Sequence, residues 1–257
     1  MPAQKVIVTR PAREAARWVA ALRAAGLDAQ PLPLVEIAPV TDTKDLQMAR
    51  QRLGDYAALM FVSASAAEHF FDGAHAIAAN LHARCWATGP GTVRALQQAG
   101  VPATAIDAPG EDAEQFDSEA LWAEVQAQVS PGARVLIVRG GDAAGQPAGR
   151  AWLAHEIVAA GGACDVVVAY RRIAPPFDVA ARALAAEGAR GEATWLFSSA
   201  EAIARLRAAM PGTAWTSARV VATHPRIAEA ARAAGFGTVR VSSPVLDALV
   251  ASIESFA

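Results

Sequence analysis

The length, composition and charge of the chain favour a globular protein of two domains. Its 257 residues are 53% hydrophobic and 19% charged, which supplies enough apolar material for sizeable cores and excludes a disordered chain. The formal net charge of −2 gives no strong field toward nucleic acid or an anionic membrane, so we expect the chain to bind neither.

The first thirty residues do not read as a secretory signal. Charged residues interrupt them at Arg13, Glu14, Arg17, Arg23 and Asp28, and no run of eighteen apolar residues occurs anywhere in the chain. We therefore expect a cytoplasmic protein.

In chain order, the first half predicts strands that alternate with helices. A helix over residues 12–25 follows the first strand and ends at Gly26, and a later helix ends at Gly100, where each glycine suits a left-handed cap. The apolar segments at the strand positions are Val6–Arg10, Leu34–Pro39, Leu59–Val62 and the segment that ends at Ala87.

The second half repeats this order. Its counterparts of the first-half segments are Val135–Gly140, a helix over 150–160 before Gly161 and Gly162, Tyr170–Pro175, Trp195–Ala202, Ala222–Pro225 with Gly235 after its helix, and a last helix around Leu249. We therefore expect an α/β fold from an internal duplication, with two lobes that are each a flavodoxin-like parallel sheet flanked by helices.

Polar residues follow the predicted strands in both copies. Ligands of open parallel sheets bind at the carboxyl ends of the strands, where helix N-termini offer free N–H groups to carboxylates or phosphates. We expect the chemistry in a cleft between the two lobes. The candidates are Arg10, Ser63, Ser65, Gly89, Thr92, Arg139, Ser198, Ser199, His224 and Arg226.

These candidates also have structural explanations, which the sequence leaves open. Ser65 with Glu68, and Ser198 with Glu201, fit the capping box of a helix start. Pro90 and Pro225 suit a first helical turn whether or not a ligand binds nearby. Arg10 and Arg139 would contribute little if each only paired with a surface carboxylate.

Tyr170 is one of two tyrosines and lies where the second copy passes from one lobe to the other. Its phenol could donate a proton in catalysis. The alternative is a half-buried tyrosine whose hydroxyl lies in water.

Cofactor motifs are missing. Cys85 and Cys164 form no C-x-x-C pair, and the five histidines have no metal-binding spacing. Residues 140–145 are glycine-rich but lack the order of a dinucleotide or phosphate loop, and no G-x-S-x-G elbow occurs. We expect no disulfide, no metal ion and no other cofactor.

Taken in order, these motifs resemble the uroporphyrinogen-III synthase family over nearly the whole chain. The motifs are Val8-Thr9-Arg10-Pro11, Phe61-x-Ser63, Gly89-Pro90-Gly91-Thr92, Val138-Arg139-Gly140 with Gly149-Arg150, Tyr170-x-Arg172 and Phe197-Ser198-Ser199. The chain departs from the family pattern at Val62, where a threonine is common, and at His224–Ile227, where a Gly-Pro-Thr-Thr-like turn is common.

The resemblance implies lobes of residues 1–36 with 174–257 and of residues 40–168, joined by paired connectors at 34–39 and 169–175. It implies that linear hydroxymethylbilane is cyclised to uroporphyrinogen III, with inversion of ring D and loss of water, in haem biosynthesis. Tyr170 would be the proton donor, Arg150 would join the substrate-binding residues, and no cofactor would be needed. We expect a monomer supplied by hydroxymethylbilane synthase.

Two other functions are compatible with a duplicated α/β chain. The first is a non-catalytic two-lobed binding or sensor module for a small polyanion, whose exported forms need a signal peptide. The second is an α/β transferase for an anionic substrate, which should carry a phosphate or dinucleotide loop.

Overall fold

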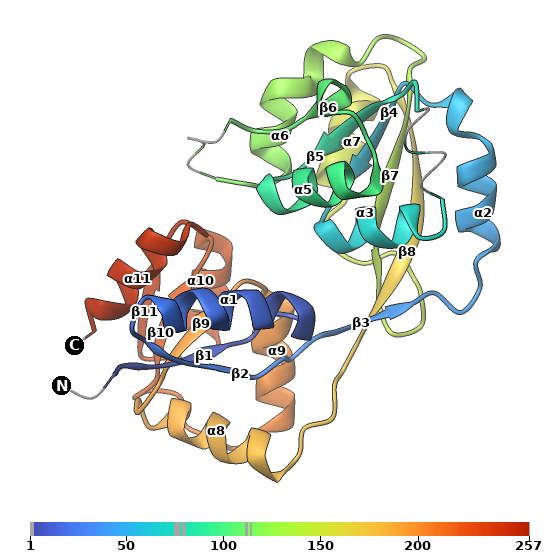
Figure 1. The fold of residues 1–257 in the computed structure, drawn as a ribbon. Helices are drawn as coiled ribbons and strands as arrows, with labels where there is room; N and C mark the ends of the chain where they lie inside the picture. Colours follow the sequence, from blue (N-terminus) through green and yellow to red (C-terminus); the bar gives the residue numbers. More distant parts are fainter. Residues whose placement is uncertain (1–2, 75–77, 79–80, 111–112, 114, 257) are drawn as a thin grey trace. The chain divides into compact units, whose positions relative to one another are not determined.

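The computed structural model describes residues 3–74, 78, 81–110, 113 and 115–256. The chain divides into two compact units, of which only the second is continuous in sequence (Figure 1). Unit 1 combines Met1–Glu36 with Ala174–Ala257, and unit 2 is Ile37–Ile173.

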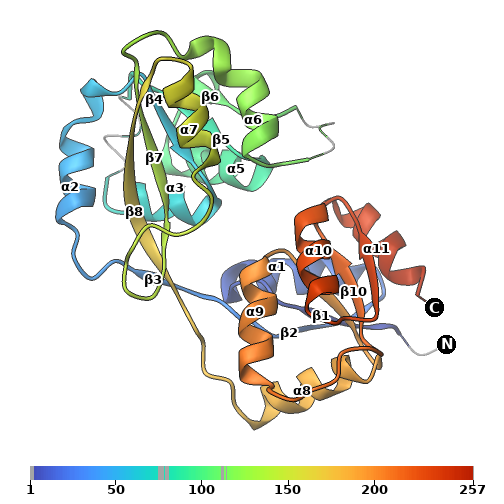
Figure 2. The same cartoon turned by 180° about the vertical axis from the view of Figure 1, so that it is seen from behind.

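Unit 1 contains a five-stranded sheet in the order β11-β10-β9-β1-β2, and all of its strand pairs are parallel. Helices cover both faces of this sheet (Figure 2). The strands are β1 (Lys5–Val8), β2 (Asp28–Pro31), β9 (Thr194–Phe197), β10 (Arg219–Ala222) and β11 (Thr238–Val241). The helices are α1 (Ala12–Ala24), α8 (Val179–Ala189), α9 (Ala200–Ala209), α10 (Pro225–Ala233) and α11 (Leu246–Glu254).

Side-chain alternation divides the core of unit 1 between the two faces of the sheet. Val6, Val8 and Leu196 pack in one cluster with buried residues of α1 and α11. Trp195 points to the other face, where its ring stacks on Phe197 at a centroid distance of 5.5 Å. The central strands β1, β9 and β10 are therefore buried on both sides, as the middle of a parallel sheet between helix layers requires.

Unit 2 contains a six-stranded sheet in the order β3-β8-β7-β4-β5-β6. The pairs from β8 to β6 are parallel. The strands are β3 (Glu36–Pro39), β4 (Ala58–Phe61), β5 (Arg84–Ala87), β6 (Ile106–Asp107), β7 (Arg134–Gly141) and β8 (Ala163–Ile173). The helices are α2 (Lys44–Gln51), α3 (Ala64–Phe71), α5 (Pro90–Ala99), α6 (Ser118–Val125) and α7 (Trp152–Ala159), with 3₁₀ turns at Leu53–Asp55, Ala103–Ala105 and Gln126–Gln128.

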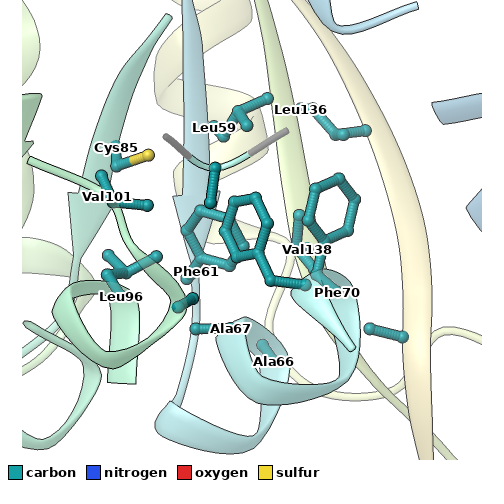
Figure 3. Close-up of a cluster of buried hydrophobic side chains, with 14 of the residues drawn as sticks. Leu59, Phe61, Ala66, Ala67, Phe70, Cys85, Leu96, Val101, Leu136 and Val138 are labelled. Atoms are coloured by element: carbon teal, nitrogen blue, oxygen red, sulfur yellow. The ribbon is translucent and has the colours of Figure 1, made fainter. Parts of the chain in front are cut away.

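The core of unit 2 also has two sides. Phe61, Phe70 and Val138 lie together between the sheet and the helices α2, α3 and α5 (Figure 3). The rings of Phe61 and Phe70 meet edge to face at 5.6 Å. On the opposite face, Val135 and Ile137 of β7 pack against α6 and α7.

The two sheets share one strand order, which confirms the predicted α/β fold with two parallel sheets flanked by helices. Apart from the additional edge strand β3 of unit 2, unit 1 runs β2-β1-β9-β10-β11 and unit 2 runs β8-β7-β4-β5-β6. The predicted pairs of equivalent segments occupy equivalent strands: Val6–Arg10 begins in β1 and Val135–Gly140 lies in β7.

The glycines that end helices behave largely as predicted. Gly26, Gly100, Gly161 and Gly235 have positive φ values after α1, α5, α7 and α10. Gly162 does not adopt this conformation, because the single residue Gly161 completes the turn after α7. Within the part of the chain described, no helix is both long and apolar enough to cross a membrane.

Candidate functional site

The parallel strands bring the predicted site residues to one edge of each sheet. In unit 2, Ser63 follows β4, Gly89 follows β5 and Arg139 lies near the end of β7. In unit 1, Arg10 follows β1 and Ser199 follows β9. Each unit thus presents its own set of helix N-termini and polar side chains at the carboxyl edge of its sheet.

Tyr170 is buried in unit 2, and its hydroxyl meets a serine. The residue is 4% exposed, and its oxygen lies 3.1 Å from Oγ of Ser63. The ring of His69, on α3, stacks on the phenol at a centroid distance of 5.8 Å. The alternative of a half-buried tyrosine with its hydroxyl in water is therefore wrong, because β8 places this ring against the α3 side of the sheet.

Ser63 is the N-cap of α3, and its Oγ accepts a hydrogen bond of 3.1 Å from the amide of Ala66. The capping box predicted for Ser65 is wrong, because the helix begins at Ala64 and buries Ser65 at 8% exposure within its first turn. Ser63 thus holds the helix start and the Tyr170 hydroxyl at once.

The second predicted capping box is also displaced, by one residue where the first is displaced by two. Ser199, and not Ser198, caps α9 by accepting a hydrogen bond of 3.2 Å from the amide of Glu201. Ser198 precedes this cap at the end of β9 and is partly exposed. In both units, the strand ends so close to the helix that the residue in extended backbone conformation directly before the first turn takes the cap.

Glycine and histidine occupy the equivalent caps of α5 and α10. Gly89 has extended backbone, and a Cβ there would lie 3.0 Å from Cβ of Phe116. Thr92 is buried in the first turn of α5. His224 caps α10 through Nδ1, which accepts a hydrogen bond of 3.0 Å from the amide of Arg226.

Pro90 and Pro225 stand at the first helical position of α5 and α10, as predicted. The side chain of Arg226 is partly exposed in the first turn of α10.

Arg10 and Arg139 take corresponding places in the two copies. In both side chains, Nε is buried without a hydrogen-bond partner among the described residues. Arg10 bonds Glu14 at 3.0 Å and lies over the ring of Trp18 at 4.6 Å. Arg10 therefore pairs with a carboxylate, as one of the two interpretations of its role expected.

Arg139 has a different environment. Its Nη1 donates to the backbone oxygen of Arg150 at 3.2 Å. Burial, followed by the like charge of Arg172, lowers the pKa of Arg139. An anion bound here would relieve both effects, since it would compensate a guanidinium that the fold has half removed from water.

Arg150 is already paired. Its guanidinium makes two hydrogen bonds to Glu119 on α6, of 2.5 and 2.8 Å, and the bond to Glu119 raises the pKa of Arg150. A substrate carboxylate would have to replace Glu119 or bind the N–H groups of Arg150 that Glu119 does not use. Sequence reasoning did not identify Glu119, because 31 residues separate the partners and no local pattern joins them.

Two further residues at this edge were not predicted as site residues. His69 stacks on Tyr170, and Gly140 lies directly beneath its ring. Gly140 stands within the motif Val138-Arg139-Gly140, which was the available signal. Among the residues described, no group of three or more His, Cys, Asp or Glu side chains is placed to hold a metal ion.

Two doubly wound sheets of one strand order, with hydroxyls, an imidazole and guanidiniums at their helix N-termini, define a duplicated α/β protein suited to an anionic ligand. The family described as uroporphyrinogen-III synthase HemD matches residues 16–251. The chain belongs to this family.

Solved structures give the same fold. A mutant uroporphyrinogen III synthase from Thermus thermophilus aligns with a TM-score of 0.58 at 17% identity, covering 99% of this chain and 97% of that one. The uroporphyrinogen-III synthetase from Helicobacter pylori 26695 aligns with a TM-score of 0.63 at 12% identity, covering 99% and 100%. No curated protein matches the chain.

The family match confirms the predicted function and enzyme class. The chain is a cyclising lyase of tetrapyrrole biosynthesis, of the uroporphyrinogen-III synthase type, that acts on a small molecule. A non-catalytic binding or sensor module is not favoured.

Proposed function

We propose that the chain performs the family reaction with Tyr170 as proton donor and with residues of both sheet edges as carboxylate ligands. The observation that carries this proposal is the placement of the Tyr170 hydroxyl, 3.1 Å from Ser63 Oγ at the start of α3. A phenol held by a serine beside a helix N-terminus is oriented for proton transfer.

The reaction requires the loss of a hydroxyl group from the end of the linear substrate. In the proposed step, Tyr170 gives its proton to that hydroxyl as the C–O bond breaks, and water leaves. Electrons from the terminal pyrrole form the azafulvene, which the substituted α-carbon of ring D then attacks to give a spiro intermediate. The older bond from that carbon to the methylene bridge of ring C then breaks and leaves a second azafulvene on ring C. The free α-carbon of ring D attacks this second azafulvene and closes the macrocycle with ring D inverted. A ring proton lost when the macrocycle closes restores the phenol, so the balance of the whole reaction is the loss of one water.

Substrate placement is the second requirement, because unguided closure gives the isomer without inversion. Acetate and propionate arms on every ring give the substrate many carboxylates, which suit free backbone N–H groups and guanidiniums. We assign this binding to a set drawn from both units: Arg10, Ser63, Ser65, Gly89, Thr92, Arg139, Arg150, Ser198, Ser199, His224 and Arg226. Holding the reacting carbons in order is the main contribution to selectivity.

The domain and supply arrangements are part of the proposal. We take residues 1–36 with 174–257 and residues 40–168 as the two lobes, with 34–39 and 169–175 as paired connectors. Support comes from the sheet of unit 2, in which β3 and β8, the strands of these connectors, are neighbours. We further propose that the chain works as a cytoplasmic monomer, needs no cofactor and receives hydroxymethylbilane from hydroxymethylbilane synthase.

The test is an isomer assay. Freshly generated hydroxymethylbilane is added to the purified chain, and the porphyrins are oxidised and separated. We expect isomer III in excess over isomer I. A product mixture equal to that of the enzyme-free control, dominated by isomer I, would reject the proposed activity.

A further inference from the structure

We propose that a bulge in β8 and the missing side chain of Gly140 together seat Tyr170 on the α3 face of the unit 2 sheet. Gly140 is then a positioning residue that acts through Tyr170. The inference rests on the proposed role of Tyr170 in the reaction.

The first observation is a shift in strand register. Val138 pairs with Val167 and Arg139 with Val168, but the next pair is Gly140 with Tyr170. Ala169 is therefore an extra residue in β8 without a partner on β7. A bulge of this kind reverses which face the following side chains take.

The second observation is the face on which Tyr170 lies. Val167 and Ala169 belong to the core cluster beside α3, so regular alternation would turn residue 170 to the opposite face, toward α7. Tyr170 instead belongs to the same cluster as Val167 and Ala169. The extra residue therefore carries the phenol from the α7 side to the side of Ser63.

The corresponding strand pair in unit 1 has no such shift. β1 and β2 pair in unbroken register from Lys5 with Asp28 to Val8 with Pro31. The pairing in unit 1 ends before Arg10, the counterpart of Arg139, so the bulge lies in the part of β7 and β8 that extends beyond the strand pair of unit 1.

The third observation is the contact beneath the ring. A Cβ at Gly140 would lie 2.5 Å from Cζ of Tyr170 and 2.8 Å from its hydroxyl oxygen. Such distances are well inside van der Waals contact, so any side chain at position 140 would push the phenol away from the sheet. Because the clash is with the hydroxyl end of the ring, the bond of 3.1 Å to Ser63 would be the first contact to break.

The experiment compares Gly140→Ala with Gly54→Ala in the full chain. A Cβ at Gly54 meets nothing within 4 Å, so this control adds a methyl group without a clash. We expect Gly140→Ala to lower kcat by about ten- to a hundredfold with little change in KM, since a reacting group is misplaced. Gly54→Ala should keep both constants.

A double-mutant cycle separates positioning from general damage. In the Tyr170→Phe background, where no hydroxyl remains to be misplaced, adding Gly140→Ala should lower kcat no further. A fall by the same factor in both backgrounds would overturn the inference, and so would a wild-type kcat for Gly140→Ala alone.

A second double-mutant cycle measures the packing of the Tyr170 ring over Gly140 and does not depend on activity. Gly140→Ala should lower Tm by roughly 5 °C when the tyrosine ring is present. In the Tyr170→Leu background, which has no ring atoms above position 140, it should leave Tm unchanged. An equal loss of Tm in both backgrounds would contradict this packing. So would an unfolded Gly140→Ala chain that Tyr170→Leu does not restore to a folded state.

The two proposals fail in different ways. If Tyr170→Phe keeps the wild-type kcat while isomer III is still formed, the proton-donor role falls, and Gly140 loses its function as a positioning residue. The Tm cycle would still decide whether Gly140 seats the ring. If no isomer III is formed by the wild-type chain, the reaction itself is refuted.

Discussion

The hydroxyl of Tyr170 and Oγ of Ser63 lie 3.1 Å apart, although 107 residues separate them in the chain. The same serine oxygen accepts the amide of Ala66 and so caps α3. The position of the phenol is therefore tied to the start of a helix, where the backbone itself attracts negative charge. Both consequences, for the proton and for the substrate carboxylates, can be measured.

Replacing Tyr170 by phenylalanine should lower kcat by about a hundredfold or more without abolishing turnover, because general acid catalysis is lost while substrate positioning remains. KM should change little. Tyr56→Phe is the matched control, since the hydroxyl of Tyr56 donates to Asp165 at 3.0 Å, away from the carboxyl edge of the sheet. Steady-state kinetics on fresh substrate give the answer, and an unchanged kcat would remove Tyr170 from the mechanism.

Ser63→Ala should affect both stability and catalysis. The lost N-cap should cost about 1 kcal/mol in the free energy of unfolding, measured with urea. Loss of the phenol's partner should lower kcat about tenfold. Asp178→Ala is the control, because Asp178 caps α8 with a bond of 2.8 Å to the amide of Ala181 and lies outside the proposed site. Asp178→Ala should lose a similar free energy of unfolding but keep the wild-type kcat. A tenfold loss of kcat in Asp178→Ala as well would show that the loss of a helix cap alone explains the effect.

Arg10→Gln and Arg139→Gln should each raise KM about tenfold, which is the expected loss of one charged hydrogen bond to a substrate carboxylate. Arg52→Gln removes the same charge from an exposed pair with Asp55 and should leave KM unchanged. The kinetics should be measured at constant ionic strength. A rise in KM for Arg52→Gln of the same size would indicate a general charge effect.

Asp165 should make the chain less stable in acid. Burial raises the pKa of Asp165, but hydrogen bonds from Arg134 and Tyr56 and the charges of Arg134 and Arg52 outweigh it, so the pKa is lowered overall. A lowered pKa in the fold means that the ionised form stabilises the fold above the unfolded value of about 4, and that this stabilisation is lost as pH falls below it.

The measurement is Tm against pH for the wild type and Asp165→Asn. The wild type should be the more stable near neutral pH, and the difference should shrink toward about pH 3, below the unfolded pKa. Arg134→Gln removes the bond of 2.6 Å to Asp165 and should likewise make Tm depend less on pH in the acid range. A difference that stays constant over the whole range would contradict the assignment.

The two thiols should resist modification in the folded chain. Burial raises the pKa of Cys85 to about 12 and that of Cys164 to about 11. At about pH 8 the thiolate is then about one in ten thousand of the Cys85 population, and the thiolate is the reactive form. A disulfide-exchange reagent should label Cys85 only after denaturation, with Cys164→Ser as the single-thiol version. Rapid labelling of that native variant would show that Cys85 is accessible.

The repeated local patterns made much of the fold predictable. β-branched runs such as Val6–Val8 and glycines such as Gly26 and Gly100 act over a few residues, and the structure uses them as expected. The two capping boxes were misplaced by a short distance, because Ser63 and Ser199 compete with their neighbours for one helix start. Which serine becomes the N-cap depends on where the preceding strand ends.

The sequence by itself determined the α/β class, the duplication, the order of strands and helices, and the edge to which the polar residues come. These properties depend on local periodicity and on the parallel direction of the strands. Only the tertiary structure decided that Tyr170 faces α3 over Gly140 and that Arg150 is held by Glu119. The physical reason is that a register shift and an ion pair arise from contacts between segments distant in the chain, where one extra residue such as Ala169 reverses the face of a strand.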